Sequence, residues 1–62
     1  MKVVIIPEYQ LNLGYVARIM YNFNFNDLII IGMKPSLESL LFAKSGKVIL
    51  KNARFILILM NS

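Results

Sequence analysis

The sequence predicts an α/β fold with a three-stranded parallel sheet and crossover helices, in the order β-α-β-α-β. Three short segments dominated by apolar residues, Lys2–Ile6, Leu28–Ile31 and Arg54–Met60, alternate with helical patterns. Their apolar residues run continuously instead of alternating, which is typical of strands buried on both faces of a parallel sheet. Parallel neighbours need crossover connections, and the intervening helices supply them.

The first helix is predicted at Leu13–Phe23. The first strand ends at Pro7, Pro7–Leu11 forms a loop, and Asn12 is a good N-cap. At about 100° per residue, one face of the helix collects apolar residues: Leu13, Val16, Ala17, Met20 and Phe23. The opposite face collects Tyr15, Arg18 and Asn22.

The remaining elements follow from turn and cap residues. A polar turn at Asn24–Asp27 precedes the second strand, and the breakers of Gly32–Pro35 follow it. Ser36 can cap a second helix at Leu37–Ala43. Ser45-Gly46 interrupts the helical pattern, and a short helix, Lys47–Leu50, follows. A turn at Asn52-Ala53 then leads into the third strand.

The composition points to a partner chain. Hydrophobic residues make up 58% of the 62 residues and charged residues only 16%, against about 25% in typical domains. A domain of this size buries only about 60% of the surface its unfolded chain exposes. Small domains often add disulfides or a zinc site to stabilise a small core, but this chain has no Cys or His to form them.

The apolar runs are too short for a membrane span of about 18 residues. Pro7 and Glu8 follow only four apolar residues, which argues against a signal peptide. A cytoplasmic location is therefore the default expectation.

The second half of the chain is basic. The net charge is +4, and after Glu38 the chain has no acid but carries Lys44, Lys47, Lys51 and Arg54. This imbalance suits a polyanionic partner. The three lysines are spaced to line one helical face, either as an RNA-backbone patch or simply as a solvated surface.

Familiar catalytic constellations are missing from the sequence. The three acids, Glu8, Asp27 and Glu38, are scattered, and there is neither a GxGxxG nor a Walker loop. The sequence therefore argues against a self-contained hydrolase or metalloenzyme, and we expect no metal site.

The residues Asn12, Gly14 and Arg18 form the main candidate site. In parallel sheets, ligands bind beyond the carboxyl ends of the strands, where this helix begins. A helix N-terminus favours an anion, Gly14 would let a ligand backbone approach, and Arg18 suits bidentate phosphate contact. The alternative is structural: Asn12 only caps, Gly14 only packs, and Arg18 is only solvated.

A longer pattern resembles a known family. The residues Pro7, Asn12-Leu13-Gly14, Arg18 and Asn22-Phe23, followed by Phe25-Asn26-Asp27-Leu28, are similar to the first motif of the SpoU-type (TrmH-like, SPOUT superfamily) RNA 2′-O-ribose methyltransferases. The similarity continues through 42–46 and 48–55. Two positions depart from it, because the family usually has Gly where this chain has Leu11 and Asn24.

The resemblance implies a homodimeric enzyme that transfers a methyl group from S-adenosylmethionine to a ribose 2′-oxygen of tRNA or rRNA. It assigns Asn12 and Arg18 to the active site. Together with the basic pattern, it suggests these RNA-binding residues: Gly14, Tyr15, Asn22, Lys44, Lys47 and Lys51.

The family's second and third motifs, which form the knotted donor-binding region, are not recognisable in these residues. We therefore expect 1–62 to be a single partial domain, the N-terminal half of the methyltransferase-like domain without the knot. Such a truncated domain would bind no cofactor itself and would be inactive alone, with a homo-oligomer or a complementing chain as its partner. The alternatives are a non-catalytic RNA-binding or dimerisation module, and a general nucleotide-binding α/β fragment.

Overall fold

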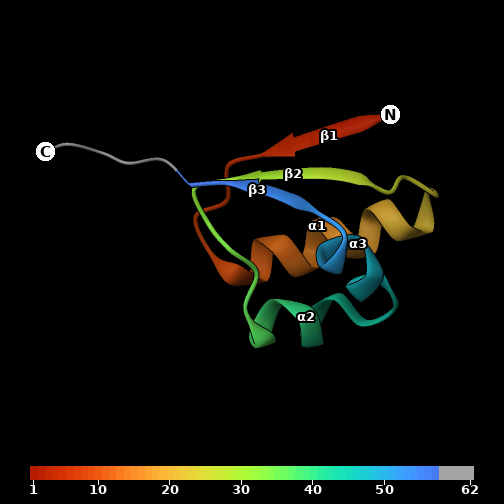
Figure 1. Ribbon diagram of the computed structural model, residues 1–62. Coiled ribbons are helices and arrows are strands. Elements are labelled where there is room, and N and C mark those ends of the chain that lie inside the picture. The colour runs from red at the N-terminus through yellow and green to blue at the C-terminus, as the bar shows by residue number, and fades with distance from the viewer. Residues whose placement is uncertain (58–62) are drawn as a thin grey trace, which may run out of the picture.

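A computed structural model describes residues 1–57 as one layer of parallel strands covered by one layer of helices (Figure 1). The strands are β1 (Lys2–Ile5), β2 (Asp27–Ile31) and β3 (Arg54–Ile56), with β2 in the centre and both neighbours parallel to it. The predicted fold class is confirmed. All helices lie on one side because two right-handed crossovers that advance in the same direction place their helices on the same face.

The helices are α1 (Gln10–Asn22), α2 (Leu37–Ala43) and α3 (Lys47–Lys51), and a 3₁₀ turn, η1 (Lys44–Gly46), joins the last two. The prediction for α2 is confirmed, and α3 is one residue longer than predicted. The longest helix has 13 residues. Within residues 1–57, no helix has the length and apolar character needed to cross a membrane.

Both predicted ends of the first helix are wrong. The helix begins at Gln10, with Tyr9 in the N-cap position, so Asn12 lies inside the first turn and does not cap it. Phe23 lies beyond the last turn and is 65% exposed, outside the core. Its ring stacks on Phe25 with a centroid distance of 6.3 Å, because the chain turns back at Asn24, which has a φ of 60°.

The core lies between the sheet and the helices. Register pairs Val3 with Leu28 and Ile5 with Ile30, and these inward side chains meet the apolar face of α1. The buried apolar residues of the described chain are Leu13, Ala17, Met20, Leu28, Ile30, Ala43, Ile49 and Leu50. Burial of these side chains between the sheet and the helices is the main stabilising contribution to the fold.

The opposite face of the sheet is open. Register places Val4 beside Ile29 and Ile31 beside Ile56 on that face. No helix of the described chain covers it, and Val4 and Ile56 are 53% and 54% exposed. The expectation of burial on both faces is therefore wrong for residues 1–57 by themselves. The third strand ends at Ile56, one residue before the predicted Leu57, and positions 58–60 of its predicted extent lie outside the described residues.

Candidate functional site

The carboxyl edge of the sheet, where a ligand site was predicted, is held by one glutamine side chain. The Gln10 amide donates to the Lys34 carbonyl oxygen at 2.9 Å, and its oxygen accepts the Ser36 N–H at 2.9 Å. These two bonds tie the start of α1 to the connection that leads into α2. Asn12 is exposed two residues further along, within the first turn of α1.

Gly14 is not open to a ligand. It is buried, and a Cβ there would lie 2.8 Å from the Phe42 ring and 2.9 Å from the Ser39 carbonyl oxygen. The absent side chain therefore lets α2 pack closely on α1. The structure supports the packing interpretation of Gly14 and corrects the expectation that RNA contacts it.

The polar face of α1 forms largely as predicted. Tyr15 and Asn22 are exposed, and Arg18 is half-buried. Asn12 and Arg18 are six residues apart, which separates them by about 9 Å along the axis and about 120° around it. Helix geometry therefore does not bring these two predicted catalytic residues together, and a ligand that contacts both must span more than one turn.

Arg18 lies instead in a pocket of about 190 Å³ between the last turns of α1 and the η1 turn. We call it the Arg18 pocket. It is lined by Arg18, Tyr21, Asn22, Ala43, Lys44, Ser45 and Gly46. Three predicted site residues thus meet in one place: Arg18, Asn22 and Lys44. Tyr21 and Ser45 were missed as site residues: both lie in stretches that resemble the family, but neither stands at a position to which the resemblance assigns a role.

Close backbone packing shapes the Arg18 pocket. A Cβ at Gly46 would lie 2.6 Å from the Ala17 carbonyl oxygen, so only glycine lets η1 approach α1 this closely. Lys44 begins the turn with a φ of 54°, which redirects the chain out of α2. The Arg18 guanidinium carbon lies 5.5 Å from the centroid of the Phe42 ring, a cation–π contact that restricts its position.

The pocket is suited to an anion. Two cationic side chains line it, and none of the described residues around it is acidic. The carboxyl ends of α1 and α2 each contribute roughly half a negative charge, which two full positive charges outweigh. Arg18 offers a planar fork of donors, and Asn22, Ser45 and Tyr21 add neutral hydrogen-bonding groups.

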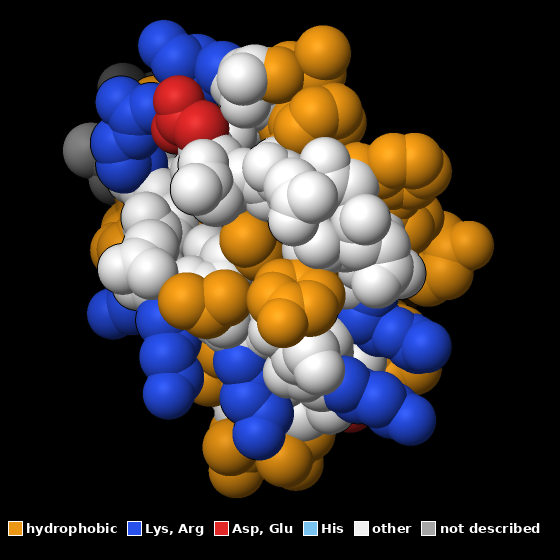
Figure 2. All heavy atoms as spheres, turned by 90° about the vertical axis from the view of Figure 1, so that its right-hand side faces the viewer, with side chains coloured by type: hydrophobic (Ala, Val, Ile, Leu, Met, Phe, Trp, Pro, Cys, Tyr) orange, Lys and Arg blue, Asp and Glu red, His pale blue; other side chains and the backbone are white. Residues whose placement is uncertain are grey.

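The basic surface extends beyond this pocket. The face at the amino ends of the strands carries a band of basic side chains beside a mostly uncharged hollow (Figure 2). Lys47 and Lys51 are one turn apart on α3 and share a face. The predicted single row of three lysines is wrong for Lys44, because the 3₁₀ turn separates it from α3.

An ion pair marks the amino end of the sheet. Arg54 donates to the Asp27 carboxylate at 2.7 Å and joins β3 to β2 there. Their side chains are 61% and 43% exposed, so the pair contributes little to stability. Arg54 is thereby partly neutralised, whereas Arg18 and Lys44 face no acid in their pocket.

Comparison with known proteins agrees with the motif pattern. No protein-family model matches the chain. Over 55 residues it is 38% identical to the tRNA (cytidine-2′-O-)-methyltransferase TrmJ of Methanocaldococcus jannaschii, a match that covers 86% of this chain and 24% of that enzyme. The chain thus spans about a quarter of its relative's length. The comparison supports the resemblance of this chain to the SpoU-type RNA 2′-O-methyltransferases.

Proposed function

We propose that this chain is the RNA-contacting N-terminal segment of a SpoU-type, TrmH-like RNA 2′-O-ribose methyltransferase, and that the Arg18 pocket holds an RNA phosphate. The observation that carries the proposal is the meeting of Arg18, Asn22 and Lys44 in one acid-free pocket. The similarity to a tRNA methyltransferase supports RNA as the polyanion.

Arg18 acts here as an anchor. A guanidinium stays protonated at neutral pH, so it serves a 2′-hydroxyl reaction by holding the neighbouring phosphate and orienting the ribose. Asn12, exposed at the first turn of α1, adds a carboxamide that hydrogen-bonds the RNA from a different side of the helix. Lys47 and Lys51 contribute sequence-independent attraction to the backbone.

The Arg18 pocket does not fit the methyl donor. S-adenosylmethionine carries a positive sulfonium group, which Arg18 and Lys44 would repel. The pocket volume of about 190 Å³ is also small for such a ligand. The proposal therefore assigns no donor site to these residues, and methyl transfer requires further protein from a longer polypeptide or a partner. A non-catalytic RNA-binding or dimerisation module is the alternative that keeps the same RNA contact.

The test compares Arg18→Ala with Lys34→Ala in RNA binding across a salt series. Each variant removes one positive charge, but Lys34 lies at the other end of the sheet, over the Phe55 ring. We expect Arg18→Ala to weaken binding about tenfold at low salt, as charged hydrogen bonds are lost. The slope of log affinity against log salt should fall by about one.

Lys44→Ala should resemble Arg18→Ala, because both residues line the same pocket. Circular dichroism melting establishes that each variant is folded, which matters for Arg18 because of its contact with Phe42. Equal salt slopes for Arg18→Ala and Lys34→Ala in folded proteins would reduce Arg18 to one part of a diffuse basic field and refute the phosphate site.

A further inference from the structure

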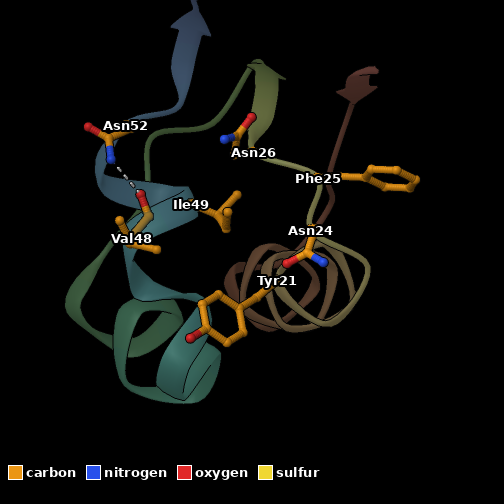
Figure 3. A pocket seen from close by; sticks show the side chains of 7 residues that line it. All are labelled: Tyr21, Asn24, Phe25, Asn26, Val48, Ile49 and Asn52. Atoms are coloured by element: carbon orange, nitrogen blue, oxygen red, sulfur yellow. Dashed lines mark hydrogen bonds between the residues drawn. The ribbon is translucent and has the colours of Figure 1, made fainter.

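A second hollow of about 370 Å³ opens at the amino ends of β2 and β3, between the end of α1 and α3 (Figure 3). Its lining residues are Tyr21, Asn24, Phe25, Asn26, Val48, Ile49 and Asn52. Neither the sequence pattern nor the methyltransferase resemblance assigns a role to this hollow. We call it the asparagine pocket.

The lining combines an apolar wall with three carboxamides. Val48 and Ile49 form the apolar side, and Figure 3 shows the Ile49 side chain pointing toward Asn24 across the hollow. The Asn52 amide nitrogen donates to the Val48 carbonyl oxygen at 3.0 Å, which leaves the Asn52 oxygen as an acceptor. The Phe25 ring points away, so its backbone forms the wall.

This chemistry selects a neutral, flat ligand with a hydrogen-bonding edge. Among the described residues, none that lines the asparagine pocket is charged, so the pocket offers an ion no counter-charge. A purely apolar ligand would strip water from three amides without replacing their hydrogen bonds. A nucleobase has apolar faces for Val48 and Ile49, and an edge that carboxamides read.

The asparagine pocket lies directly beside the Arg18 pocket. Tyr21 lines both the asparagine pocket and the Arg18 pocket, so the two adjoin across one side chain. A neutral pocket beside a cationic pocket matches the two parts of a nucleotide, its base and its phosphate. A duplex does not supply such a base, since its edges are paired and the A-form major groove is too narrow for side chains.

Building on the proposed function, we propose that the asparagine pocket binds one unpaired base of the RNA whose phosphate occupies the Arg18 pocket. Adenine is the favoured base, because a carboxamide pairs bidentately with its N6 and N7. The chain would thereby select a single-stranded or looped segment of RNA over a helical one.

The test measures fluorescence anisotropy with short labelled oligoribonucleotides: an adenosine strand, a matched abasic ribose-phosphate strand and a duplex. We expect the adenosine strand to bind about five- to a hundredfold more tightly than the abasic strand. Equal binding of both strands, with the Arg18→Ala defect retained, would overturn the base site and leave the phosphate site standing. Adenosine monophosphate that binds as tightly as the strand would identify a free nucleotide as the ligand and also overturn the proposal.

Two variants locate the effect. Val48→Phe fills the hollow, and Asn26→Ala removes an exposed carboxamide that lines it. Each should abolish the difference between adenosine and abasic strands and leave the salt slope unchanged. Leu41→Phe on the exposed face of α2 controls for added bulk. An adenosine preference that survives Asn26→Ala and Val48→Phe in folded proteins would rule out this pocket as its source.

Discussion

At the residue scale, two glycines determine how the helices pack and therefore how the site is shaped. Because Gly14 has no side chain, α2 packs closely against α1. Because Gly46 has none, η1 packs closely against the backbone of α1. The contact at Gly46 is with backbone atoms of Ala17 and Arg18, which cannot rotate away as a side chain can. A methyl group there must displace η1, and with it Lys44 and the wall of the Arg18 pocket.

Gly46→Ala is therefore expected to destabilise the protein by about 1–3 kcal/mol, the usual cost of overpacking. It should also weaken RNA binding, because η1 carries Lys44. Urea unfolding followed by circular dichroism measures the stability change. Ser45 is the exposed residue next to Gly46. The control variant Ser45→Ala should change the free energy of unfolding by less than about 0.5 kcal/mol. Equal stability of Gly46→Ala and the unmodified chain would show that η1 moves freely relative to α1.

At the element scale, α1 performs two tasks on two faces. Leu13, Ala17 and Met20 pack into the core, while Arg18 and Asn22 line the pocket. The same helical period that buries one set of residues presents the other set to solvent. Any change that rotates or unwinds α1 disturbs the core and the candidate site together.

Leu13 and Leu11 provide a matched test of this orientation on one helix. Leu13 is fully buried, whereas Leu11 is 48% exposed. Leu13→Ala should cost about 2–5 kcal/mol through the lost burial and the cavity left behind. Leu11→Ala should lower the free energy of unfolding by less than about 1 kcal/mol. Chemical denaturation measures both, and comparable losses for the two variants would contradict the helix orientation.

At the scale of the whole molecule, the sheet has one covered and one open face. The open face is apolar toward the carboxyl ends of the strands, with Val4, Ile29, Ile31 and Ile56, and ends in the Arg54–Asp27 pair. Parallel sheets are almost always covered on both faces. An exposed apolar surface of this kind in a small chain favours association, and a second copy of the chain supplies a matching apolar face.

We therefore expect the 62-residue chain to sediment as a dimer or a larger species. Val4→Lys should shift the distribution toward monomer, because a charge on the open face is costly to bury. Leu37→Lys, on the helix layer, adds the same charge to an exposed position of α2 and should leave the distribution unchanged. A well-folded monomer at every accessible concentration would contradict this prediction.

Local pattern was enough for most of the fold. The strands and α2 follow from apolar runs, breakers and cap residues that act within a few positions. The start of α1 was missed because Asn12 is the better intrinsic N-cap. The hydrogen bonds of the Gln10 side chain with Lys34 and Ser36 instead stabilise a helix that begins at Gln10. The exposure of Phe23 was missed for a related reason: helical spacing places Phe23 on the apolar face only if the helix continues through it, and α1 ends at Asn22.

The sequence by itself determined that Arg18, Tyr15 and Asn22 share a polar face, because a helical period is a local property. It also singled out Lys44, although only as part of a lysine row. Only the tertiary structure decided that Lys44 joins Arg18, that Gly14 packs against α2, and that Tyr21 separates a cationic pocket from a neutral one. These outcomes depend on how closely η1 and α2 approach α1, a distance set by packing between segments far apart in the chain.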